Sequence, residues 1–154
     1  PFGGQAYSGR VSASPRTQKQ DLALTDDNHN KTEVYQFILE EIDTVPHLEA
    51  LLLLWNTRPR GWSRQDLSER LYISPSAAQV LLQDLVRQGL AIGAAAALDQ
   101  YSYNEESQEK NRVVSLVDAI YRKEVVRIST LIHSKPSSSL RDFARAFRFT
   151  KERE

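Results

Sequence analysis

The stretch from Ser63 to Gly89 constrains the fold most, because it contains two helix-start signals close together and one helix-stop signal. Ser63, followed by Asp66, is typical of a helix N-cap and predicts a short helix that ends at Leu71. Ser74 is a second N-cap, and the helix that it begins ends at Gly89, a residue that favours helix C-caps. Two helices joined by so tight a turn form a helix-turn-helix.

The second helix of this pair is predicted to run from Pro75 to about Gln88, since proline is favoured at the first helical position. Its apolar side chains recur at helical spacing and predict one buried face. The opposite face is polar and is expected to be exposed, at a width that fits the major groove of DNA. The buried face is predicted to consist of Ala78, Leu81, Leu82 and Leu85.

Further elements are predicted on both sides of the helix-turn-helix. Helical spacing of apolar residues and the positions of proline predict three more long helices, and two short apolar runs predict a hairpin. Ser139 and Asp142 are spaced as a capping box and predict a last helix near the C-terminus. In chain order the predicted elements are helices Lys31–Asp43 and Pro46–Asn56, the helix-turn-helix, strands Leu90–Ile92 and Leu98–Tyr103, helix Ser107–Ser134, and the last helix.

The predicted fold class is therefore mainly α with a small β-hairpin: a winged helix-turn-helix with an N-terminal and two C-terminal extra helices. Residues 1–30 are rich in small and polar residues and are predicted to form a flexible tail. Residues 31–106 would form the winged helix-turn-helix domain with its leading helix. Residues 107–154 would form the C-terminal helices.

The segment WSRQDLSERLYISPSAAQVLLQDLVRQGLA resembles the helix-turn-helix of bacterial winged-helix transcriptional regulators. The segment LIHSKPSSSLRDFARAFRFTKER is similar to the ending of uncharacterised bacterial proteins that pair a winged helix with two C-terminal helices. The resemblance implies that the second helix reads base edges and that the hairpin touches the DNA backbone or minor groove. Winged helices also serve as protein-binding modules, so an adaptor without DNA binding is the alternative.

Candidate DNA contacts follow from the resemblance and from side-chain chemistry, because glutamine can pair with adenine and arginine with phosphate. An ordinary solvated surface is the alternative for each of these side chains. The sequence departs from the regulator pattern in its predicted wing, Gly93–Gln100, which has no basic residue and contains Asp99. The exposed polar face of the helix that begins at Pro75 also lacks arginine and lysine, apart from Arg87 near the far end of that helix. The candidates are Arg58, Arg60, Arg64, Ser74, Ser76, Ala77, Gln79, Val80 and Gln83.

The helix predicted over Ser107–Ser134 has a long apolar stripe that favours either dimerisation or packing within the chain. Residues 107–154 also contain 11 basic and 6 acidic side chains, although the whole chain is formally neutral. The last helix could dock a partner protein, an anionic surface or nucleic acid, or it could pack on its own domain. The candidate dimer or partner surface consists of Val113, Val117, Ile120, Ile128, Leu131, Phe143 and Phe147.

An enzymatic function is not predicted. The chain has no cysteine, no glycine-rich phosphate loop and no nucleophile elbow. His29, His47 and His133 have no neighbours at zinc-ligand spacing, so neither a metal nor a cofactor is expected. No apolar run is long enough for a membrane span, and a cytoplasmic location is expected. The sequence thus predicts a DNA-binding transcriptional regulator, as a dimer, with double-stranded DNA as its partner.

Overall fold

The computed structural model describes residues 3, 15–93 and 99–136. Its elements are helical apart from one antiparallel pair of short strands, so the predicted fold class is confirmed. No helix in the described ranges is long and apolar enough to cross a membrane. In chain order the elements are α1 (Pro15–Glu41), α2 (Val45–Thr57), α3 (Arg64–Leu71), α4 (Pro75–Arg87), β1 (Ala91–Gly93), β2 (Tyr101–Tyr103), α5 (Gln108–Lys123) and α6 (Val125–His133).

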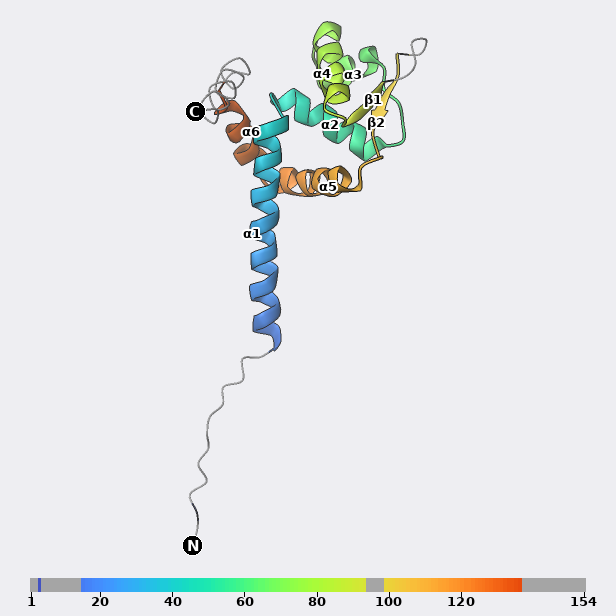
Figure 1. Cartoon of the computed structure of the whole chain (residues 1–154). Coiled ribbons are helices and arrows are strands. Elements are labelled where there is room, and N and C mark those ends of the chain that lie inside the picture. The colour runs from blue at the N-terminus through green and yellow to red at the C-terminus, as the bar shows by residue number, and fades with distance from the viewer. Residues whose placement is uncertain (1–2, 4–14, 94–98, 137–154) are drawn as a thin grey trace, which may run out of the picture.

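Helix α2 lies at the centre of the fold, with α3 and α4 on one side and α5 on the other (Figure 1). Its start is capped by Thr44, whose hydroxyl accepts a hydrogen bond from the His47 amide. Leucines on several sides of α2 are buried, because other elements pack around it. The fully buried leucines of this helix are Leu48, Leu51 and Leu54.

The helix-turn-helix is formed by α3 and α4, and the bounds predicted for both helices are confirmed to within one residue. The hairpin follows α4, and Ala91 pairs with Tyr103 while Gly93 pairs with Tyr101. Trp62, just before α3, adds a further antiparallel bridge to Tyr101. This order of helix-turn-helix and hairpin is a winged helix-turn-helix.

The strand boundaries differ slightly from the prediction. Leu90 precedes β1 and is buried, and its backbone N–H bonds to Leu85 O near the end of α4. The second strand begins only at Tyr101, and residues 94–98 at the tip of the hairpin lie outside the described residues.

Helix α1 begins at Pro15, so it extends through residues 15–30 and the helix start predicted at Lys31 is wrong. That half of the helix lacks the apolar stripe on which the prediction relied, but it contains several good helix formers. In the second half of α1, Val34, Ile38 and Ile42 are fully buried. The first half extends away from the rest of the molecule (Figure 1).

The prediction of a single helix over Ser107–Ser134 is wrong. The helix is interrupted at Glu124, which separates α5 from α6. Glu124 has a non-helical backbone, and its carboxylate accepts hydrogen bonds from Tyr35 Oη at 2.6 Å and Lys31 Nζ at 3.0 Å. The break allows both helices to pack against α1. Periodicity alone did not reveal it, since the apolar spacing continues through the break.

Candidate nucleic-acid interface

The turn between α3 and α4 is fixed by local hydrogen bonds. Tyr72 adopts a left-handed conformation with φ of 57°, and its backbone N–H bonds to Ser68 O at the end of α3. The Ser68 hydroxyl is buried and donates to Ile73 O at 2.8 Å. Ser74 then caps α4, since its Oγ accepts from the Ala77 amide at 3.1 Å. These contacts set the direction in which α4 leaves α3.

The outward face of α4 is open to solvent. Ser74, Ser76 and Gln83 are exposed, and Val80 retains 54% of its surface accessibility. The candidates Ala77 and Gln79 are half-buried, because they lie on the flanks of this face. The opposite side of α4 is buried, as predicted, and it consists of Ala78, Leu81, Leu82 and Leu85.

Arg58 is engaged by its own chain. Its guanidinium lies 3.5 Å from the centre of the Trp55 ring, donates to Trp55 O at 2.5 Å and forms an ion pair with Glu105 at 3.5 Å. These contacts hold the side chain between α2 and the loop after β2. A phosphate contact would have to compete with Glu105, so the structure weakens Arg58 as a candidate.

Arg60, which precedes α3, and Arg64, at its start, are both exposed. The guanidinium of Arg60 stacks over the Trp62 ring, 4.2 Å from its centre. Arg64 is the first residue of α3, and its Nη1 donates to Gln79 Oε1 on α4 at 2.5 Å. Neither arginine has a carboxylate within ion-pair distance among the described residues. Both can therefore neutralise an anion without breaking an ion pair among the described residues.

The base of the wing is held by aromatic packing. Tyr103 is buried, and its ring meets the edge of Trp55 at a centroid distance of 5.0 Å. Burial raises the pKa of Tyr103 to about 12, and its hydroxyl donates to Asn111 Oδ1 at 2.9 Å. The wing is thus attached to both α2 and α5.

The candidate dimer stripe of α5 and α6 faces the protein's own core. Val117 and Ile128 are fully buried, and the other three described members pack against the buried cluster. This burial favours the intramolecular alternative for the stripe. Phe143 and Phe147 lie outside the described residues. The partly buried members are Val113, Ile120 and Leu131.

A histidine–carboxylate cluster links the start of α2 to α4. His47 Nε2 lies 2.9 Å from Asp84 Oδ2, and its Nδ1 lies 2.7 Å from Thr44 Oγ1. With Asp43, these side chains bring three potential metal-ligand atoms within 4.8 Å of one another. Sequence reasoning missed the cluster, because His47 and Asp84 are far apart in the chain. Both ring nitrogens of His47 already have partners within the protein, so the cluster is satisfied as a contact between two helices.

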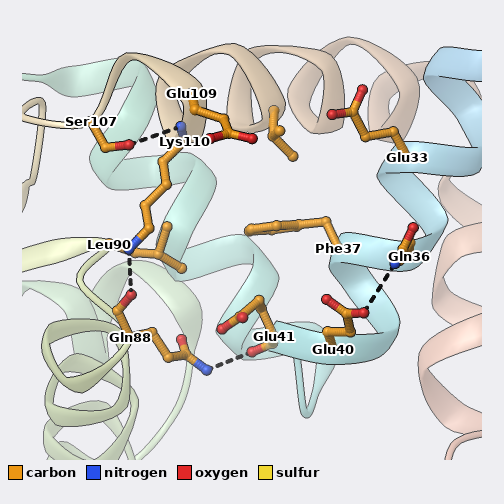
Figure 2. A pocket seen from close by; sticks show the side chains of 11 residues that line it. Glu33, Gln36, Phe37, Glu40, Glu41, Gln88, Leu90, Ser107, Glu109 and Lys110 are labelled. Carbon is orange, nitrogen blue, oxygen red and sulfur yellow. Dashed lines mark hydrogen bonds between the residues drawn. The ribbon is translucent and has the colours of Figure 1, made fainter.

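A cavity of about 400 Å³ lies between α1, the end of α4 and α5 (Figure 2). Figure 2 shows Lys110 donating to Gln88 O, and Gln88 Nε2 donating to Glu41 O. None of the candidate DNA contacts lines it, so it is separate from the outward face of α4. Its acidic side chains disfavour anionic ligands; they are Glu33, Glu40, Glu41 and Glu109.

No protein-family model matches the chain, and no curated protein matches its sequence. Among solved structures, the chain is similar to the MepR–DNA complex of S. aureus, with a TM-score of 0.47 and 14% identity over 86% of this chain and 98% of that one. It is also similar to the heme sensor PefR of Streptococcus agalactiae, with a TM-score of 0.46 and 16% identity over 92% and 94%. A third similar structure is the multiple antibiotic-resistance repressor MarR of Listeria monocytogenes, with a TM-score of 0.44 and 14% identity over 88% and 91%.

Proposed function

We propose that this protein is a transcriptional regulator that binds double-stranded DNA by inserting α4 into the major groove. The observation that carries the proposal is the exposed polar face of α4, which no other described element covers. A helix in this position of a helix-turn-helix has the width and the donor and acceptor groups that base-edge recognition requires.

The positive charge beside the start of α3 supports the same function. Arg60 and Arg64 lie beside the start of α3, where the amides of the first helical turn also favour a phosphate. Phosphate neutralisation provides most of the sequence-independent affinity for DNA. In this proposal the two arginines contact the backbone, while Gln79, Gln83 and Val80 face the bases.

The proposal is tested by the fluorescence anisotropy of a labelled random-sequence duplex over a range of salt concentrations. The wild-type affinity should fall steeply as salt rises, with a log–log slope of about −0.9 for each phosphate contact. Arg60→Ala should weaken binding to all sequences and reduce the slope by about one contact. Arg122→Ala on α5 is the control, because it removes the same charge from an exposed side chain outside the helix-turn-helix. Equal losses in both variants, or no binding of the wild type at low salt, would remove the assignment.

The alternative is a protein-interaction module, which the absence of basic residues in Gly93–Gln100 favours. Val80 and the 94% exposed Tyr72 would supply apolar contacts to a partner protein. This alternative predicts little affinity for duplex DNA at any salt concentration, so the same titration separates the two functions.

A further inference from the structure

Arg64 and Gln79 form a hydrogen bond between the two helices of the helix-turn-helix, although they are distant in the sequence. Arg64 Nη1 donates to Gln79 Oε1 at 2.5 Å. Arg64 is held at the first position of α3 by the Ser63 cap, and Gln79 is held by the packing of Ala78 and Leu82 on the same helix. The contact therefore joins two side chains whose backbones are both fixed.

This contact determines which end of the Gln79 amide faces the arginine. A guanidinium has only donors, whereas a glutamine amide has one acceptor oxygen and one nitrogen with two donors. The oxygen must therefore face Arg64, whichever way the amide would otherwise turn. The Nε2 group of Gln79 has no hydrogen-bond partner among the described residues and remains available as a donor.

The orientation changes what Gln79 can recognise. A glutamine pairs with adenine by accepting from N6 and donating to N7, which requires both ends of its amide. With its oxygen accepting from a charged donor, Gln79 keeps Nε2 as the end of its amide without a partner, and the Arg64 N–H groups beside the oxygen oppose the approach of a second donor such as adenine N6. Guanine presents two acceptors in the major groove, O6 and N7, while adenine presents one acceptor and one donor.

From this geometry we infer that Gln79, held by Arg64, reads guanine rather than adenine at its base-pair position. The inference depends on the proposed function, since it names the base that this part of α4 selects. Arg64 acts as a positioning residue for Gln79, and its other N–H groups add further donors beside the same position. A free glutamine would give the opposite preference.

Gln83 provides an internal comparison. It lies one turn further along α4, is exposed, and has no hydrogen-bond partner in the described part of the chain. Both ends of its amide are available, so it should select adenine by the usual two-bond pairing. Loss of Arg64 should change the base preference at the Gln79 position and leave that at the Gln83 position unchanged.

The experiment is selection of bound sequences from random duplexes, with wild type, Arg64→Met, Arg64→Lys, Gln79→Ala and Gln83→Ala. The two alanine variants identify the base-pair position that each glutamine reads. Wild type and Arg64→Lys should prefer guanine at the Gln79 position, and Arg64→Met should change that preference to adenine. Paired duplexes that differ at this position should show a change of roughly 5- to 100-fold in relative affinity. Low salt keeps Arg64→Met binding measurable, because backbone contacts strengthen as salt falls.

The inference is overturned if wild type prefers adenine at the Gln79 position, or if Arg64→Met retains guanine there. It is also overturned if Arg64→Met changes the Gln83 position equally, since that would indicate a general shift of α4. A wild type that binds DNA but enriches no base at the Gln79 position overturns the inference alone. A wild type that binds no DNA overturns the proposed function itself, so the two failures are distinguishable.

Discussion

Helix α4 and the helix pair α5–α6 all have one apolar side, yet their polar sides have different surroundings. The polar side of α4 is largely open, with Ser76 and Gln83 exposed. On α5–α6, polar side chains are tied to α1, because Arg112 forms an ion pair with Glu33 and the Glu124 carboxylate binds Lys31. The difference shows that an amphipathic pattern identifies the buried side of a helix but leaves open what contacts the other side.

The largest effects should come from shortening the buried side chains of both regions. Leu82→Ala in α4 and Ile128→Ala in α6 each remove a fully buried side chain, and each should cost about 2–5 kcal/mol of unfolding free energy. Urea denaturation at two protein concentrations measures both costs. A loss below about 1 kcal/mol for Ile128→Ala, or a midpoint that depends on concentration, would contradict the intramolecular packing of α6.

The cap of α4 should have a smaller effect. Ser74→Ala removes the acceptor for the Ala77 amide and should cost about 1 kcal/mol, measured by thermal or urea unfolding. Ser74→Asn is the matched control, because asparagine also caps helices and should retain most of that stability. If Asn and Ala are equally destabilising, the Ser74 hydroxyl stabilises the protein by some means other than capping.

The stability contributed by the hydrogen bonds between α1 and Glu124, just before α6, should depend on pH. Hydrogen bonds from Tyr35 and then Lys31 lower the pKa of Glu124 below its ordinary value of 4.5. A lowered folded-state pKa means that the stabilisation is complete above pH 4.5 and is lost as the pH falls through the lower, folded-state value. The stability difference between wild type and Glu124→Gln should therefore shrink as the pH is lowered from 7 to 3.

The control for this pH dependence is Glu106→Gln, which changes an exposed glutamate in the loop before α5. Its stability relative to wild type should vary less over the same pH range. A Glu124→Gln difference that stays constant with pH would show that the carboxylate charge does not stabilise the α1–α6 contact.

The smallest effects should come from exposed valines. Val80→Ala on α4 and Val126→Ala on α6, which are 54% and 79% exposed, should each change stability by less than about 0.5 kcal/mol. Equilibrium urea denaturation is the measurement. A loss above 1 kcal/mol for Val126→Ala alone would indicate that a second copy of the chain covers α6, as the dimer hypothesis requires.

Much of the helix-turn-helix could be predicted, because its signals are local. Ser63 and Ser74 cap the helices that follow them, and the leucines of α4 are buried as their spacing indicates. The start of α1 and the break at Glu124 could not be predicted, since neither interrupts the local pattern in a recognisable way. At the break, the Glu124 carboxylate accepts hydrogen bonds from Lys31 and Tyr35, which lie far away in the sequence.

The candidate interface also has one part that could be predicted from the sequence and one part that could not. The exposed face of α4 follows from spacing, so Ser76 and Gln83 were identified correctly as exposed residues. The engagement of Arg58 by Trp55 and Glu105 depends on how α2 meets the loop after β2. The substitutions at Arg60, Arg64, Gln79 and Gln83 test the roles proposed for these residues in DNA binding.

Local sequence is sufficient to place the starts and ends of the two helices of the helix-turn-helix and their apolar sides, because caps and periodicity act over a few residues. The pairing of distant polar groups becomes visible once the helices are packed together: Arg64 with Gln79, His47 with Asp84, and Glu124 with α1. The physical reason is that a hydrogen bond requires two atoms within about 3 Å. For residues distant in the chain, that distance is set by the packing of whole helices.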